Sequence, residues 1–195
     1  MRKVEQIFQG AVDIFAEKGF DRATMDEVAE RSGVAKGTLY YHFDGKEDLI
    51  AFLMEEGLER LSKYVHEAVA GCDDPAEQLR RAIYGLVRFF DQNRDFCQML
   101  LMGVWFNRER QVQFRQILRN FYSQLAAIIQ AGMERGQLRP MPAELSATGL
   151  FGLISVISLR VILDGDAMDC EQLGNFIFQQ YLNGARICGE KETSL

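Results

Sequence analysis

The stretch that decides the fold is GVAKGTLYYHFDGKEDL, residues 33–49, in which two tyrosines and a histidine follow one another. In a helix with 3.6 residues per turn, three consecutive large side chains with polar tips cannot all face a core. Leu39 and Phe43 lie four residues apart, so they are expected to share the buried face of this helix. The two tyrosines and the histidine are then expected at the surface.

A second short helix is expected just before this one. Thr24 and Glu27 have the spacing of a capping box, in which each side chain bonds to the backbone of the other residue. Val28 and Ala29 are expected on the buried face, and Gly33 supplies a tight turn. A helix, a tight turn and a second helix make a helix-turn-helix. The outward face of its second helix would hold Lys36, Gly37, Thr38, Tyr40, Tyr41 and His42.

This outward face has the chemistry of a surface that contacts phosphates and bases. Lysine supplies charge, hydroxyl groups donate to phosphate oxygens, and Gly37 removes bulk where a backbone must approach. Lys46 follows in the first turn of the next helix, where backbone N–H groups also favour an anion. Tyrosines that pack on a neighbouring helix are the simpler alternative, but the whole set of residues favours a nucleic-acid surface.

Residues from about 5 to 50 resemble the N-terminal domain of the TetR family of bacterial transcriptional repressors. The matching run is AVDIFAEKGFDRATMDEVAERSGVAKGTLYYHFDGKEDLI, residues 11–50, which combines KGF, VAERSGV, KGTLYYHF and KEDL. The resemblance implies a three-helix DNA-binding domain, followed by a helical domain that dimerises and usually binds a small molecule.

The resemblance also assigns contacts with DNA. It places Thr24, Tyr40 and Lys46 on phosphates of the backbone, residues 36–38 where the recognition helix enters the major groove, and residues 41–42 on backbone or bases. The expected DNA-binding positions are Thr24, Ala35, Lys36, Gly37, Thr38, Tyr40, Tyr41, His42 and Lys46. The family varies most at Ala35, Lys36 and Tyr41, which would therefore bias the operator sequence.

The rest of the chain is also expected to be helical, giving an all-α fold of about nine helices without a period-2 strand. Helix starts are expected where a capping side chain precedes a helical pattern, at Asp44, Asp74 and Asp169. We expect a helix-turn-helix domain over residues 1–46, a helical effector-binding and dimerisation domain over 47–190, and a tail over 191–195.

An aromatic and methionine-rich region in the middle of the chain is the expected effector pocket, because such side chains line adaptable apolar cavities. At helical spacing they could equally form plain core. The candidates are Phe89, Phe90, Phe96, Met99, Met102, Trp105, Phe106, Phe121 and Tyr122. Cys97 could be a redox sensor in this region, but a small buried apolar residue is the favoured interpretation.

The last two long helices are the expected dimer interface, because small residues in the first of them let helices approach closely. They could instead only close the core of each subunit. The candidates are Gly152, Ser155, Leu159, Phe176, Ile177, Gln180 and Tyr181. An operator of two half-sites about 34–36 Å apart favours a homodimer.

Composition limits the other classes of function. The net charge is −6, and residues 1–47 carry nine acidic against seven basic side chains, so any DNA surface is a local patch. The uncharged apolar run over residues 145–159 is shorter than the ~20 residues of a membrane span, so a buried helix and no membrane partner are expected. The scattered cysteines and the lack of an export signal favour a cytoplasmic protein. Catalytic and paired-cysteine motifs are absent, so we expect no enzyme, metal or cofactor.

The expected function is a dimeric repressor that binds a palindromic double-stranded DNA operator and is released by a small-molecule effector of unknown identity. The effector would favour a tilt of the helix that begins near Lys46. Two alternatives share the same DNA-binding motif. One is an activator, and the other is a regulator that is controlled by a protein partner or that has no small-molecule ligand.

Overall fold

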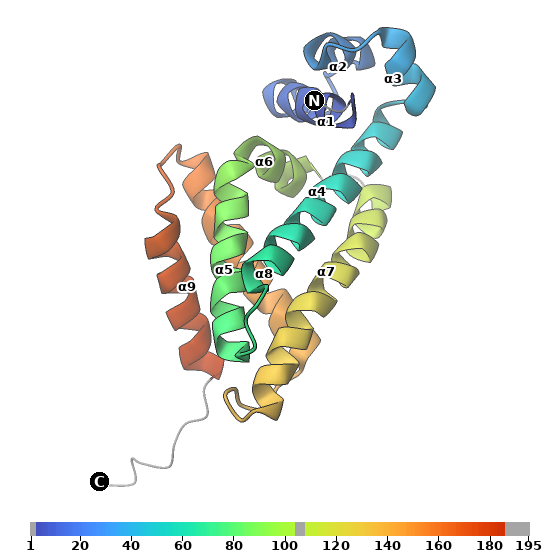
Figure 1. The fold of residues 1–195 in the computed structure, drawn as a ribbon. Coiled ribbons are helices and arrows are strands. Elements are labelled where there is room, and N and C mark those ends of the chain that lie inside the picture. The colour runs from blue at the N-terminus through green and yellow to red at the C-terminus, as the bar shows by residue number, and fades with distance from the viewer. Residues whose placement is uncertain (1–2, 104–107, 186–195) are drawn as a thin grey trace, which may run out of the picture.

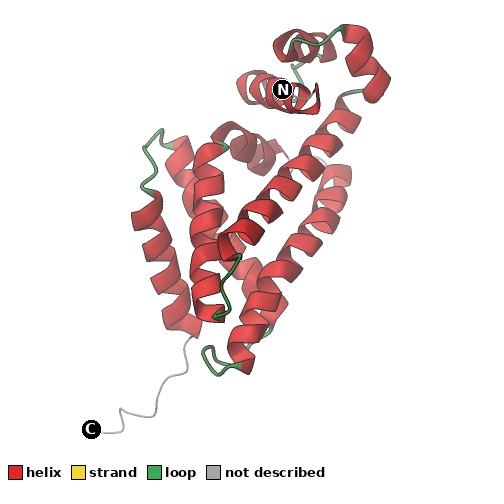
Figure 2. Ribbon diagram, viewed as in Figure 1, coloured by secondary structure: helices red, strands yellow, loops and turns green. Residues whose placement is uncertain are grey.

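A computed structural model describes residues 3–103 and 108–185, and within these ranges the chain forms nine helices and no strand (Figures 1 and 2). The all-α fold expected from the sequence is therefore confirmed. The helices are α1 (Lys3–Lys18), α2 (Met25–Ser32), α3 (Lys36–His42), α4 (Lys46–Val69), α5 (Pro75–Gln92), α6 (Arg94–Gly103), α7 (Arg108–Glu134), α8 (Ala143–Leu163) and α9 (Cys170–Ala185).

Helices α1, α2 and α3 form a small head at one end of the molecule (Figure 1). Val28 and Leu39 are fully buried where α2 and α3 meet, and Phe43 is nearly so, as their spacing predicts. Gly33 ends α2 with a φ of 66°, a left-handed conformation that glycine adopts without strain. These residues fix how α2 and α3 pack, and they leave the side of α3 opposite Leu39 exposed to solvent.

The contact between α1 and α2 depends on one small residue. A Cβ atom added to Gly10 would lie 2.7 Å from the backbone nitrogen of Ser32, which cannot move away as a flexible side chain could. Any larger residue at this position would push the two helices apart.

Helix α4 leads from the head into a larger body formed by the remaining helices (Figure 1). It packs against α5 and α7, while α5 also packs against α8 and α9. A second link joins head and body, because α1 packs against α6. The head is therefore joined to the body in two ways: α4 continues the chain from α3, and α1 packs against α6.

Two of the three expected capping residues start their helices. The Asp74 carboxylate accepts a hydrogen bond from the backbone N–H of Glu77 at 2.9 Å, and Asp169 accepts one from Gln172 at 2.9 Å. The expectation for Asp44 is wrong. Helix α4 has Gly45 as its N-cap and no side-chain cap, because its third residue, Asp48, accepts from the backbone N–H of Asp44 instead, at 3.2 Å.

Helix α8 is, among the described residues, the one helix long and apolar enough to cross a membrane by length and composition alone. It packs against α5, α6, α7 and α9. Its inner face buries Leu150, Phe151 and Ile154. The buried helix expected from the sequence is therefore found only on this inner face, because Leu145 and Val156 on α8 are exposed.

Candidate nucleic-acid interface and ligand cavity

The outward face of α3 is the most exposed aromatic surface of the head. Tyr41 is 84% exposed and Tyr40 52%, although both are large side chains that would normally be covered. The rings of Tyr41 and His42 are nearly perpendicular, with their centroids 5.2 Å apart. Ala35, Lys36 and Gly37 are exposed as well, and Thr38 is half-buried. The structure thus brings the expected α3 residues together on one face.

Lys36 at the start of α3 pairs with an acidic residue of α2. Its Nζ atom donates to Asp26 Oδ2 at 2.7 Å, and both side chains are well exposed. This hydrogen bond raises the pKa of Lys36 above its ordinary value. Because exposed ion pairs contribute little to stability, Lys36 can exchange Asp26 for a DNA phosphate or base at low cost.

Lys46 has a structural role that the sequence did not suggest. Its Nζ atom donates to the backbone oxygens of Phe20 and Asp21, at 3.0 and 3.1 Å, and lies 4.9 Å from the centre of the Phe20 ring. Lys46 therefore fastens the start of α4 to the loop between α1 and α2. The phosphate contact that the resemblance implies for this residue stays a prediction.

Thr24 forms the expected capping box with Glu27. The Thr24 hydroxyl and backbone N–H both donate to Glu27 Oε2 at 3.0 Å, and the hydroxyl accepts from the Glu27 backbone N–H at 3.3 Å. Lys18 donates to the other carboxylate oxygen at 2.7 Å. These bonds, that of Lys18 first, lower the pKa of Glu27 to about 2. A phosphate contact by the Thr24 hydroxyl would require it to turn away from Glu27.

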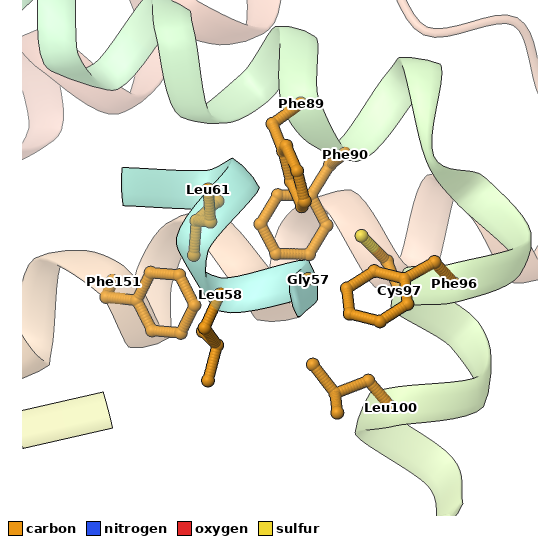
Figure 3. A pocket seen from close by; sticks show the side chains of 9 residues that line it. All are labelled: Gly57, Leu58, Leu61, Phe89, Phe90, Phe96, Cys97, Leu100 and Phe151. Carbon is orange, nitrogen blue, oxygen red and sulfur yellow. The ribbon is translucent and has the colours of Figure 1, made fainter. Parts of the chain in front are cut away.

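An enclosed apolar cavity of about 20 Å³ lies in the body between α4, α5, α6 and α8 (Figure 3). This is space for about one water molecule, although the lining side chains are apolar except for the weakly polar thiol of Cys97. The lining residues are Gly57, Leu58, Leu61, Phe89, Phe90, Phe96, Cys97, Leu100 and Phe151. Three of the expected pocket residues therefore line it, all of them phenylalanines.

Of the other expected pocket residues, three lie in the core around the cavity, and the rest fall where the structure does not describe the side chain. Phe121 and Tyr122 contact the ring of Phe151 at 5.1 and 5.8 Å between centroids, so they lie behind one cavity wall. Met99 is buried in the same core. Trp105 and Phe106 lie outside the described residues, as does the side chain of Met102.

The sequence reasoning missed the wall contributed by α4. Gly57, Leu58 and Leu61 recur at helical spacing on the buried face of α4. A glycine in the interior of a helix costs roughly 0.5–1 kcal/mol relative to alanine. Such a glycine inside a long amphipathic helix signals a close approach by another element, and this signal could have identified Gly57.

Cys97 is buried among apolar neighbours in this cavity wall. Burial raises the pKa of its thiol well above the ordinary range. The thiolate is the reactive form of cysteine, so this environment suits a small apolar residue better than a sensor.

An exposed apolar stripe runs along α8 and α9. Leu145, Val156 and Leu163 on α8 and Phe176 on α9 are each at least half exposed. Gly152, an expected dimer residue, has open space where a Cβ would stand. The remaining expected dimer residues are placed as follows: Gln180 exposed, Leu159 and Tyr181 half-buried, and Ser155 and Ile177 buried inside the chain.

Comparison with known proteins gives two sequence-profile matches. Residues 7–52 match "Bacterial regulatory proteins, tetR family", and residues 72–159 match "Tetracyclin repressor-like, C-terminal domain". Together they cover more than half of the chain, including the head and most of the body.

Individual relatives extend the similarity to nearly the whole length. The chain is 24% identical over 186 residues to the fatty acid metabolism regulator protein of Bacillus subtilis, covering 93% of this chain and 95% of that protein. It is 31% identical over 88 residues to the transcriptional activator FasR of Mycolicibacterium smegmatis, covering 45% of this chain and 40% of that protein.

A solved structure shares the fold. The regulator FadR of Bacillus subtilis, solved in complex with stearoyl-CoA, superposes with a TM-score of 0.84 at 22% identity, covering 92% of this chain and 98% of that one. The relatives are transcriptional regulators and not enzymes, as the sequence led us to expect. With its exposed α3 face, its apolar cavity and both profile matches, this chain belongs to the TetR family of DNA-binding bacterial regulatory proteins.

Proposed function

We propose that the chain is a dimeric repressor that binds a palindromic operator and is released by a small apolar effector. The observation that carries this proposal is the path of α4. This helix begins directly behind the exposed face of α3, and its residues Gly57, Leu58 and Leu61 line the apolar cavity in the body. A ligand in the cavity would contact the same rigid element that positions the head.

A long-chain fatty acyl-CoA is the effector class that we favour. The Bacillus subtilis relative is named for fatty acid metabolism, and a protein of the same fold was solved with stearoyl-CoA. The cavity lining here consists of leucine, phenylalanine, glycine and cysteine, which suits an alkyl chain. A cavity of about 20 Å³ is too small for such a chain, so its walls must separate on binding. The effector then acts through its higher affinity for the opened conformation.

The exposed stripe on α8 and α9 supports a homodimer, which as a bacterial DNA-binding regulator would act in the cytoplasm. Val156 and Phe176 are 69% and 52% exposed, as apolar side chains that a second copy would cover. Half-sites about 34–36 Å apart require two recognition helices, and a two-fold interface would supply them.

A gel-shift titration tests the proposal, using a duplex selected from random-sequence DNA by the purified protein. Stearoyl-CoA should lower the affinity for this duplex by about 5- to 150-fold, the range of typical allosteric couplings. Free coenzyme A is the control, because it lacks the chain that would enter the cavity. Unchanged affinity with stearoyl-CoA would reject this effector. A regulator that has no ligand, or that is controlled by a protein partner, would be unaffected by every small molecule.

Activation is the second candidate function, because FasR, 31% identical over 88 residues, is named as an activator. A reporter gene placed behind the selected duplex distinguishes the two. Repression predicts higher expression when the gene for this protein is deleted, and activation predicts lower expression.

A further inference from the structure

Phe96 of α6 touches both the ligand cavity and the DNA-binding head. It is one of the residues that line the cavity (Figure 3). The centroid of its ring also lies 5.4 Å from that of Phe8 on α1, with the two planes inclined at 37°. The described ring contacts of the other three lining phenylalanines, apart from that of Phe89 with Phe96, are with residues of α4, α5, α7 and α8. Within the described chain, therefore, the aromatic path from cavity to head passes through Phe96.

Phe8 also contacts Arg60 of α4. The Arg60 guanidinium lies 3.8 Å from the centre of the Phe8 ring. The same guanidinium donates to both carboxylate oxygens of Glu5 on α1, at 3.2 and 2.6 Å, and to Glu56 at 3.0 Å. Phe8 on α1 thus contacts both Phe96 of α6 and Arg60 of α4, so a displacement of either side chain would act on α1.

Gly57 fixes where the Phe96 ring can lie. A Cβ atom added to Gly57 would overlap the ring of Phe96, so the ring rests directly against the backbone of α4. Packed interiors deform little, because neighbouring side chains already fill the available space. If an alkyl chain separates α4 from α6, the Phe96 ring must move away from the backbone of Gly57. The ring of Phe8 lies next to that of Phe96 and would have to move as well.

We propose that Phe96 is a positioning residue that transmits occupation of the cavity to the head, with Phe8 as its contact on α1. The proposal rests on the function proposed above and adds the side chains that carry the signal. An apolar chain in the cavity displaces the Phe96 ring from Gly57, the ring displaces Phe8, and α1 shifts against α4. The head then no longer holds the two α3 helices at operator spacing.

The variant Gly57→Ala tests this route without any ligand, because its methyl group forces the Phe96 ring to move. Affinity for the selected duplex should fall at least about fivefold, the lower end of typical couplings. Gly132→Ala is the matched control. Gly132 is also a buried glycine within a helix, α7, but its Cβ would meet the Leu138 side chain at 2.9 Å, away from the cavity lining and from α4. This control should bind the duplex as the wild type does.

The double variant Gly57→Ala with Phe96→Leu separates transmission from damage to the core. Leucine keeps the site apolar but removes the ring that the new methyl group would strike, so duplex affinity should return to within about twofold of that of Phe96→Leu alone. For the single variant Phe96→Leu, calorimetry first gives its own affinity for stearoyl-CoA, so that a saturating concentration can be used. At saturation, the loss of duplex affinity caused by stearoyl-CoA should be at least about fivefold smaller than in the wild type.

Two results overturn the proposal. One is a folded, dimeric Gly57→Ala variant with wild-type duplex affinity, and the other is a Phe96→Leu variant with the full wild-type response to stearoyl-CoA. If Gly57→Ala does not fold, the exchange rates of α1 backbone amides in Phe96→Leu decide, because loss of the contact with Phe8 should speed them and unchanged rates reject the route. If the wild type ignores stearoyl-CoA, the proposed effector fails, while the ligand-free comparison of Gly57→Ala with Gly132→Ala still tests the coupling.

Discussion

Lys36 and Asp26 form an ion pair across the two helices of the helix-turn-helix, with 2.7 Å between Nζ and Oδ2. If Lys36 contacts DNA as predicted, Asp26 competes with DNA for the one lysine on the outward face of α3. The ion pair holds the Lys36 side chain in place on a head that has an excess of acidic residues.

Replacing this competitor should strengthen DNA binding. In Asp26→Asn the lysine loses its charged partner and the surface loses a charge that repels phosphates, so duplex affinity should rise by about two- to fivefold. A gel-shift titration at fixed salt measures this. Asp73→Asn, in the exposed loop before α5, changes the net charge equally and should leave affinity unchanged. Equal gains in both variants would show a general charge effect.

Lys36 and Tyr40 should affect DNA binding in different ways. Lys36→Ala should lower the slope of log affinity against log salt by about one, as expected for a lost phosphate contact. Tyr40→Phe removes only a hydroxyl, so affinity should fall several-fold while the salt slope stays the same. Unchanged duplex affinity in both variants would mean that the outward face of α3 does not contact DNA. Melting temperatures equal to that of the wild type would exclude unfolding as the cause.

The capping box should make the head sensitive to acid. The folded pKa of Glu27 is about 2, below its ordinary value of 4.5, so this carboxylate stabilises the folded state above about pH 4.5. That contribution is lost as the pH falls from 4.5 toward 2, because the folded state must then take up a proton against the bonds from Lys18 and Thr24.

The variant Glu27→Gln tests this dependence. Its melting temperature should be lower than that of the wild type at pH 7, and the difference should narrow as the pH approaches 3. Circular dichroism at 222 nm measures both. Glu30→Gln, exposed on the same helix, should follow the wild type across this range. A constant difference between Glu27→Gln and the wild type at all pH values would contradict the assignment.

Charges on the exposed stripe should separate the proposed dimer. Val156→Glu and Phe176→Glu would each place a carboxylate in an apolar interface, so sedimentation should show monomers and duplex affinity should fall by more than tenfold. Val112→Glu is the control, because Val112 is also half exposed but lies on α7. A dimer that survives both charged variants would place the interface elsewhere.

The head was largely predictable because its signals are local. The capping box at Thr24, the glycine at position 33 and the four-residue spacing of Leu39 and Phe43 each act within a few residues, so sequence alone determined the fold of the helix-turn-helix and its outward face. The wrong cap at Asp44 is a shift of one residue. It arose because Gly45 can adopt the extended backbone of an N-cap without offering a side chain.

Contacts between distant segments could not be predicted in the same way. Lys46 bonds to backbone oxygens of the loop near Phe20, and no periodic pattern marks a carbonyl as an acceptor. The small-residue pattern of α8 suggested interface positions, but it could not tell which face the body covers. Ser155, which this pattern suggested, is buried by the body, whereas Val156 beside it is exposed and was not among the predicted positions.

Because α4 is one unbroken helix, a rotation of α4 at the cavity would also move its end at the head. Its 24 residues form one helix, and its first turn lies about 16 Å from Gly57 at 1.5 Å per residue. A rotation of about 10° around the cavity would carry the near end of the helix through about 3 Å, which is close to the rise of one base pair. In the dimer proposed above, release from DNA would therefore need no unfolding. A rotation too small to break any helix would move the two recognition helices out of register with the two grooves that they must enter together.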